Sequence, residues 1–184
     1  MKIQKMKWSS FIGTPNVVLL FTGNMSSSPQ GNAVMGAGLA KELAKYSPEL
    51  KATFSTELLK LPVVEKTMKE MGNGTLLPFN IHKPSFINCG NIVLKGSGLS
   101  SPVYMLPVKR AFWDKAEIDL IRRSLVSLGK KAADNPEITY VCNFPGIGAG
   151  GLKYMDVLEV AKKALEHVPN VILLLKDPKE KKNK

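Results

Sequence analysis

Hydrophobic residues along the chain gather in short continuous runs that alternate with amphipathic stretches. The runs at 17–22 and Val171–Leu175 are almost entirely apolar and rich in branched side chains, a pattern typical of strands buried on both faces. Weaker runs predict further strands at 91–95, 103–108 and 138–144. Strands that alternate with helices in this way predict an α/β sandwich around a largely parallel sheet.

Helices are predicted between these strands wherever apolar residues recur at helical spacing. These segments are 35–46, 114–133 and 155–167. Asp114 and Glu117 have the spacing of a capping box, so we expect the second of these helices to begin at Asp114. The segment 53–71 has a mixed pattern interrupted by Pro62, which predicts one or two short helices.

The composition is that of a basic, globular chain. Its 184 residues suffice for one core, and we predict a single domain over 1–176 followed by a basic tail over 177–184. The net charge of +11 is compatible with nucleic acid, phosphates or acidic partners, although general basicity that aids solubility is the simpler interpretation. No apolar run is long enough to span a membrane, and Cys89 and Cys142 form no metal-binding motif. We therefore expect an intracellular protein, cytoplasmic or, in a eukaryote, nuclear, with no membrane partner, metal or cofactor; the oligomeric state is left open.

Two glycine-rich loops each follow a predicted strand and precede a predicted helix. The first reads Val-Met-Gly-Ala-Gly-Leu-Ala over 34–40, and the second reads Pro-Gly-Ile-Gly-Ala-Gly-Gly over 145–151. Glycine lets the backbone approach a ligand closely, and unpaired N–H groups at a helix start favour an anion. Because both loops leave the carboxyl ends of strands, we expect them to converge on one crevice suited to a pyrophosphate. Neither is a P-loop, and a dinucleotide-binding fingerprint at 146–151 is a weaker alternative because no acidic residue follows about 20 positions on.

These loops and the segment between them resemble the macro domain family. Met-Gly-Ala-Gly-Leu-Ala-Lys-Glu-Leu over 35–43 is similar to the first binding loop and helix of macro domains. Leu-Pro-Val-Lys-Arg over 106–110 is similar to the Pro-Thr-Lys-Arg stretch of one branch, which holds antitoxin-type and terminal ADP-ribose glycohydrolases and the yeast ADP-ribose 1″-phosphate phosphatase. The segment 143–152 resembles the second loop of that branch, and the resemblance covers most of 17–175. It implies a three-layer α/β/α sandwich with a mostly parallel mixed sheet that binds ADP-ribose in a cleft.

The resemblance also implies the residues of the site. Lys109 falls on the lysine with which some relatives attack or hold the distal ribose, so it is the predicted catalytic residue. Ser10 stands where many macro domains have an adenine-binding aspartate, and the asparagine near the distal ribose maps to Asn24 or Asn32. The second loop lacks the aspartate that glycohydrolases of this branch keep there, which weakens a catalytic interpretation. The full predicted ligand-binding set is Ser10, Asn24, Asn32, Met35, Gly36, Ala37, Gly38, Gly146, Ile147, Gly148, Ala149, Gly150 and Gly151.

Three functional hypotheses follow from these residues. The leading one is a domain that binds ADP-ribose, free or attached to a protein, with weak catalysis or none. The second is an enzyme that uses Lys109, either an ADP-ribosyl hydrolase or an ADP-ribose 1″-phosphate phosphatase. The third is a nucleic-acid or poly-ADP-ribose binder that uses the basic surface, although the sequence lacks the aromatic and basic ladder of single-strand binders.

Overall fold

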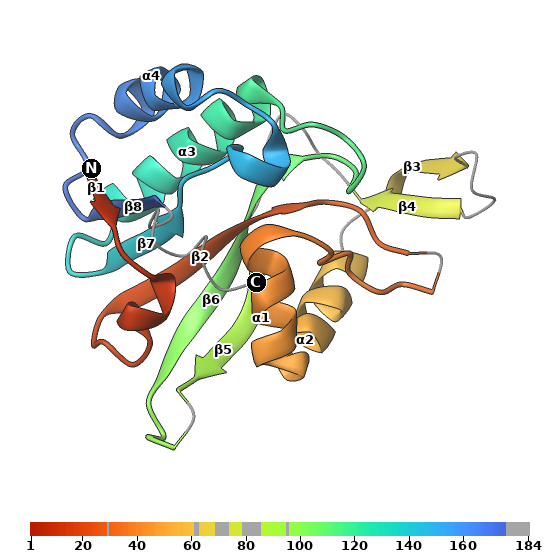
Figure 1. Ribbon diagram of the computed structural model, residues 1–184, viewed down its shortest axis with the longest axis horizontal. Helices are drawn as coiled ribbons and strands as arrows, with labels where there is room; N and C mark the ends of the chain where they lie inside the picture. The colour runs from red at the N-terminus through yellow and green to blue at the C-terminus, as the bar shows by residue number, and fades with distance from the viewer. Residues whose placement is uncertain (29, 61–62, 69–73, 79–85, 95, 176–184) are drawn as a thin grey trace, which may run out of the picture.

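The computed structural model describes the chain except at residues 29, 61–62, 69–73, 79–85, 95 and 176–184, so the predicted tail lies outside the described residues. The main sheet (Figure 1) has the strand order β1 (Lys2–Lys5), β8 (Val171–Leu175), β7 (Thr139–Asn143), β2 (Val17–Asn24), β6 (Ser100–Lys109) and β5 (Ile87–Val93). Neighbouring strands run parallel except β5, which pairs antiparallel with β6. The mixed, mostly parallel sheet is thus confirmed.

Helices cover both faces of this sheet. On one face lie α1 (Gly38–Tyr46), α2 (Pro48–Leu59) and the short 3-10 helix η1 (Trp8–Phe11), and on the other lie α3 (Ile118–Ala133) and α4 (Tyr154–Leu165). β2 serves both layers, because Leu19 and Phe21 pack in the first core and Leu20 packs in the second. The three-layer α/β/α sandwich is confirmed. None of the described helices is both long and apolar enough for a bilayer.

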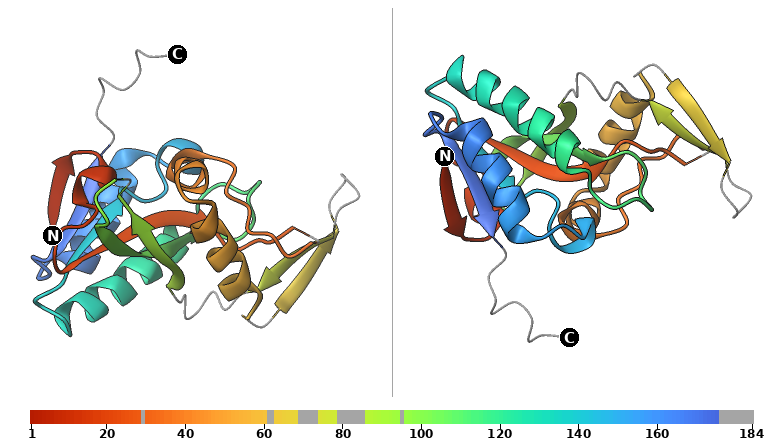
Figure 2. Two further views of the ribbon diagram at one scale, coloured as in Figure 1. Left: turned by 90° about the horizontal axis from the view of Figure 1, so that it is seen from below. Right: turned by 90° about the horizontal axis from the view of Figure 1, so that it is seen from above.

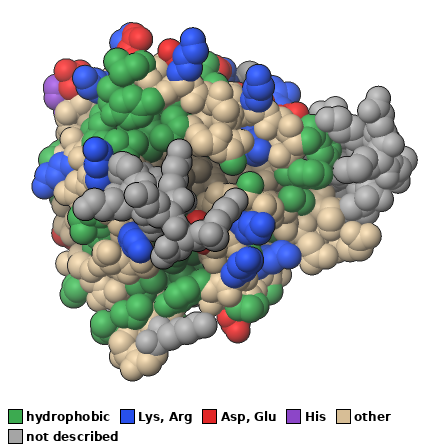
Figure 3. All heavy atoms as spheres, viewed as in Figure 1, with side chains coloured by type: hydrophobic (Ala, Val, Ile, Leu, Met, Phe, Trp, Pro, Cys, Tyr) green, Lys and Arg blue, Asp and Glu red, His purple; other side chains and the backbone are tan. Residues whose placement is uncertain are grey.

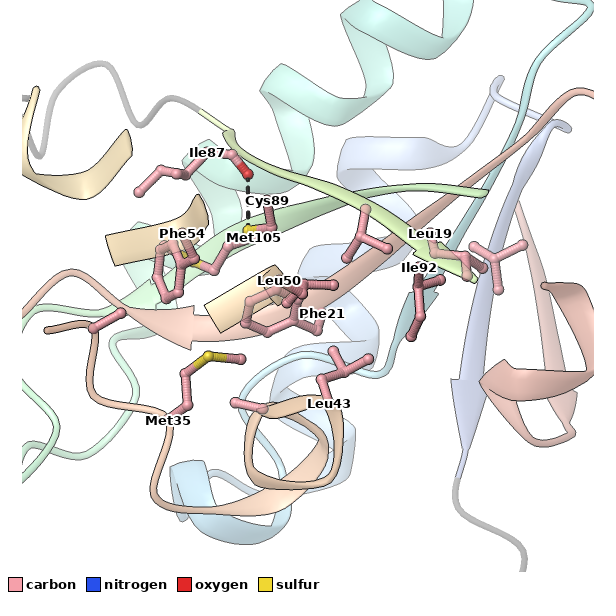
Figure 4. Packing of buried hydrophobic residues seen from close by; sticks show 14 of the residues in the cluster. Leu19, Phe21, Met35, Leu43, Leu50, Phe54, Ile87, Cys89, Ile92 and Met105 are labelled. Atoms are coloured by element: carbon pink, nitrogen blue, oxygen red, sulfur yellow. Dashed lines mark hydrogen bonds between the residues drawn. The ribbon is translucent and has the colours of Figure 1, made fainter. Parts of the chain in front are cut away.

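The core under α1 and α2 consists of aromatic and branched side chains from the sheet and both helices (Figure 4). Phe21 of β2 and Phe54 of α2 meet edge to face, with ring centroids 5.8 Å apart. Leu43 of α1 and Leu50 of α2 are also fully buried. Burial of a large apolar side chain contributes about 1.5–3 kcal/mol. These contacts therefore fix α1 against β2, and with it the loop that precedes α1.

β2 and β7 part at their carboxyl ends. Their backbone pairing ends at Leu20 and Cys142, whereas β2 stays paired with β6 as far as Asn24. The chain after β2 leads to α1 on one face, and the chain after β7 leads to α4 on the opposite face. Adjacent parallel strands whose connections leave to opposite faces create a crevice at that edge of the sheet.

The expectation of one or two short helices over 53–71 is confirmed for the part that α2 covers, and it is wrong for 63–68. α2 ends at Leu59, and Val63–Met68 is a strand, β3. It pairs antiparallel with β4 (Gly74–Pro78) in a separate two-stranded hairpin that stands beyond α2 (Figure 2). The β3 segment contains two valines and a threonine, and β-branched residues favour extended backbone. This local preference outweighs the weak helical pattern.

The capping box predicted at Asp114 is also wrong. The Asp114 carboxylate accepts a hydrogen bond from the Ala111 N–H at 3.0 Å and so closes a turn that precedes the helix. α3 begins at Ile118, and the preceding Glu117 carboxylate forms an ion pair with Arg110 at 3.1 Å. Aspartate side chains readily bond nearby backbone donors outside helices, and this alternative prevails here.

We predict that Leu125→Ala destabilises the fold by about 2–5 kcal/mol, because loss of a buried leucine leaves a cavity between α3 and the sheet. Leu125 is 0% exposed, whereas the adjacent Val126 is 38% exposed. Val126→Ala is the matched control and should change the free energy of unfolding by no more than about 0.5 kcal/mol. Denaturant unfolding followed by circular dichroism measures both changes. Equal losses in the two variants would contradict this assignment of the buried face of α3.

Candidate ligand-binding cleft

A cleft of about 290 Å³ opens where β2 and β7 part. Its volume is near the lower limit, roughly 300 Å³, of sites that hold small molecules. The carboxyl ends of β2, β6 and β7, together with the segment that follows each strand, form its walls. The described lining residues are Thr22, Gly23, Asn24, Val34, Gly36, Ala37, Gly38, Leu39, Ala40, Val108, Lys109, Phe112, Asn143, Gly146, Ile147, Ala149 and Gly150.

One wall of the cleft is the start of α1. Ala37 occupies the N-cap position, and within the described chain no side chain caps this helix and no acid lies in its first turn. Gly38 has a left-handed φ of +56°, and a Cβ at Gly36 or Gly38 would meet no atom within 4 Å. The first N–H groups of a helix have no intrahelical partner. This wall therefore offers free donors and the positive end of a helix dipole to an anion.

The opposite wall is the glycine loop between β7 and α4, which contains the 3-10 helix η2 (Gly148–Gly150). Gly146 is required by packing, since a Cβ there would lie 2.4 Å from Ile121 Cδ1. The loop therefore lies directly against α3. Among the described residues, no backbone acceptor takes the N–H groups of Ile147 and Ala149. Ile147 and Ala149 line the cleft, so the second wall also suits an anion.

A chain of hydrogen bonds joins the segment before α1 and the turn after β6 to the end of β2. The pairing of β2 with β6 shifts register just before Asn24, which places Asn24 opposite Lys109. The Asn24 side chain accepts from Ser26 Oγ at 2.6 Å and donates to the Val34 carbonyl at 2.8 Å. Ser26 Oγ in turn accepts the Phe112 N–H at 3.1 Å. Two buried polar side chains thus hold the turn after β6 and the segment before α1 on one strand end.

Lys109 is the only ionisable residue in the described lining. Its Nζ donates to the carbonyl of Phe112 at 2.8 Å and to that of Asp114 at 3.2 Å. Burial lowers the pKa of Lys109 from its ordinary value because the charged amine loses solvation, and the nearby Asp114 charge opposes this shift. A bound anion would stabilise the charged amine and raise the pKa of Lys109 again.

Comparison with known proteins identifies the architecture. No protein-family model matches the sequence, and no curated protein matches it. The solved macrodomain of Thermus aquaticus DarG aligns with a TM-score of 0.63 at 16% identity, over 96% of this chain and 97% of that one. The macrodomain of Mycobacterium tuberculosis DarG gives a TM-score of 0.63 at 18% identity over the same shares. Thermosipho africanus DarTG in complex with ADP-ribose gives 0.60 at 20% identity, over 98% of this chain and 45% of that one. The chain has the macrodomain fold.

The macrodomain cleft brings together most of the residues predicted from the sequence. Those that line it are Asn24, Gly36, Ala37, Gly38, Lys109, Gly146, Ile147, Ala149 and Gly150. The remaining predicted residues, Ser10, Asn32, Met35, Gly148 and Gly151, are outside the lining. Ser10 is exposed in η1, Asn32 is exposed before α1, and Met35 is buried in the core. Contact with a ligand stays a prediction for both groups.

The cleft also contains residues that are not in the predicted ligand-binding set, although several of them belong to the motifs quoted from the sequence. They are Thr22, Gly23, Val34, Leu39, Ala40, Val108, Phe112 and Asn143. Thr22 and Asn143 are polar residues at the carboxyl ends of buried strands, and this position alone is a signal of a site in a parallel sheet. Phe112 is an aromatic residue two positions after the basic residue Arg110, which is a second usable signal, and its side chain is 39% exposed in the structure.

We predict that NMR titration of the Lys109 side chain gives a pKa below the ordinary value of about 10.4. Asp114→Asn should lower this pKa further because it removes the opposing charge, whereas Asp119→Asn, at an exposed position of α3, should not change it. The folded protein then binds this proton less tightly than the unfolded chain does. Consequently the contribution of Lys109 to the free energy of unfolding rises with pH between its depressed pKa and about 10.4. A pKa at or above the ordinary value would contradict the burial of the amine.

Proposed function

We propose that the cleft binds ADP-ribose or a close derivative, with the diphosphate between the start of α1 and the loop before α4. The observation that carries this proposal is the pair of opposed walls with free backbone donors, around a described lining that holds one cation and no carboxylate. Two linked phosphates match two adjacent anion sites. Lys109 adds a charge-assisted donor beside them.

Further observations support the same ligand. Thermosipho africanus DarTG, which is similar in fold, has been determined in complex with ADP-ribose. The apolar lining residues Val34, Leu39 and Val108 and the exposed ring of Phe112 supply surfaces for a base or a sugar ring. In this proposal an ADP-ribosylated protein is the corresponding macromolecular partner.

Gly36→Asp should weaken ADP-ribose binding at least about tenfold, roughly 1.4 kcal/mol. The added carboxylate repels the diphosphate and competes for the donors at the start of α1. Gly36 has open space at its Cβ position and no left-handed φ, so the variant should fold normally. Gly36→Asn is the uncharged control of matched size and should lose less affinity. Isothermal titration calorimetry measures the three dissociation constants, and absence of saturable wild-type binding at millimolar ADP-ribose would refute the proposed function.

Two enzymatic activities are second candidates, and the place of Lys109 in the cleft favours them. An ADP-ribosyl hydrolase needs a base or a positioned water, and the described lining holds no Asp, Glu or His. An ADP-ribose 1″-phosphate phosphatase relies more on backbone donors and a lysine to hold the terminal phosphate. The absence of an acid therefore weighs less against the phosphatase than against the hydrolase.

We predict that the wild-type protein is inactive. It should turn over ADP-ribose 1″-phosphate and ADP-ribosylated protein no faster than Lys109→Ala does. Phosphate release and ADP-ribose release are the two measurements. Lys162→Ala, at an exposed position of α4, controls for the loss of one surface charge. Turnover that Lys109→Ala abolishes and Lys162→Ala retains would establish an enzyme and contradict a function limited to binding.

A nucleic-acid or poly-ADP-ribose binder has less support. On the face shown in Figure 3, Lys and Arg side chains lie in several separate places, with acidic side chains among them. Binding through general basicity weakens steeply as the salt concentration rises. Binding in the cleft should instead depend on the charge placed at Gly36, so a salt series with Gly36→Asp separates the two functions.

A further inference from the structure

Thr22 and Asn143 form a side-chain clasp where β2 and β7 stop pairing. Asn143 Oδ1 accepts the Thr22 N–H at 2.9 Å, and Asn143 Nδ2 donates to Thr22 Oγ1 at 2.8 Å. The orientation of this amide follows from the contacts, because a backbone N–H can only donate and so must face the amide oxygen. The clasp joins the last part of β2 to β7 below the opening of the cleft, and both residues line the cleft.

The clasp leaves hydrogen-bond donors unused. A threonine hydroxyl that accepts from Asn143 still has its own proton to donate, and an amide nitrogen carries a second N–H. Among the described residues, neither group has a further acceptor. Both side chains are partly exposed, and the space they adjoin is the cleft. An acceptor in the cleft would therefore satisfy both donors at once.

The position of Thr22 indicates which part of a ligand these donors meet. Side chains alternate along a strand, so Thr22 leaves the sheet on the same side as Leu20, which packs in the core under α3 and α4. The glycine loop before α4 lies on that side. The Thr22 hydroxyl thus lies on the side of the wall that carries Ile147 and Ala149, whose N–H groups have no backbone acceptor among the described residues. Asn143 instead alternates with Val141 of the core under α1 and α2, so the clasp spans the floor between the two walls.

We propose that Thr22 and Asn143 recognise a phosphate oxygen of the diphosphate from the floor of the cleft. The inference rests on the proposed binding of ADP-ribose. A phosphate oxygen accepts several hydrogen bonds and donates none, which matches the two unused donors of the clasp. Thr22 and Asn143 are therefore further ligand-binding residues for the diphosphate.

Thr22→Val tests the donor with little change of shape, since valine keeps the backbone N–H that Asn143 accepts. We expect the dissociation constant for ADP-ribose to rise about tenfold and Thr22→Ser to restore it. Asn143→Asp should weaken binding further, because its carboxylate accepts the hydrogen bond that the threonine hydroxyl would donate to the ligand and also repels the diphosphate. Thr139→Val, at the amino end of β7, is the matched control and should bind as the wild type does. Thermal unfolding of each variant separates loss of fold from loss of affinity.

A ligand series then locates the contact. Thr22→Val should raise the dissociation constants for ADP-ribose and for ADP by a similar factor, because both ligands contain the diphosphate. A penalty confined to ADP-ribose would place the donors on the distal ribose and overturn the inference. Equal ADP-ribose affinity of wild type and Thr22→Val would also overturn it, while the proposed function would stand. Wild-type protein that binds neither ligand would refute the proposed function, and the inference with it.

Discussion

Two neighbouring parallel strands, β2 and β7, send their chains to helices on opposite faces of the sheet, and the cleft depends on this parting. Backbone pairing between them stops at Leu20 and Cys142, while β6 holds the rest of β2 in place. One glycine-rich segment therefore stands on each side of the gap. Backbone donors reach the gap from both sides because each segment leads into a helix on its own face of the sheet.

Side-chain hydrogen bonds connect the strands at this edge, where backbone hydrogen bonds between β2 and β7 have ended. Asn143 bonds Thr22 where β2 leaves β7, and Asn24 bonds Ser26 and Val34 where the register of β2 shifts. If one partner of such a hydrogen bond is removed and the other is left buried, the free energy of unfolding falls by about 1–3 kcal/mol. The residues that shape the floor of the cleft therefore also hold the sheet edge together, and a change to either property affects the other.

The architecture could be predicted because its central strands are strong hydrophobic signals. β8 has the bounds that its apolar run indicates. β1, which reads Lys-Ile-Gln-Lys, gives no such signal because it is a short edge strand with little to bury. Asp114 shows a different limit, since its spacing to Glu117 fits a capping box but the carboxylate bonds a nearer N–H.

The candidate site also has a part that the sequence predicts and a part that it does not. The glycine-rich segments could be predicted because their composition is local and each adjoins a recognisable strand and helix. The clasp of Thr22 and Asn143 could not, because it joins residues 121 positions apart and requires knowledge of which strands are neighbours. Met35 shows the converse: it belongs to a motif that faces the cleft, yet its own side chain packs in the core.

α1 begins without a cap of its own. At many helix starts a Ser, Thr, Asp or Asn side chain closes the first N–H groups, and replacement of that residue by alanine costs about 0.5–2 kcal/mol. Ala37 at the N-cap of α1 provides no such side chain. Under the proposed function, an anion in the cleft would bond the first N–H groups of α1 as a capping side chain does, and the ligand would thereby stabilise the folded state. The free energy of unfolding of the domain would then rise with the concentration of its ligand.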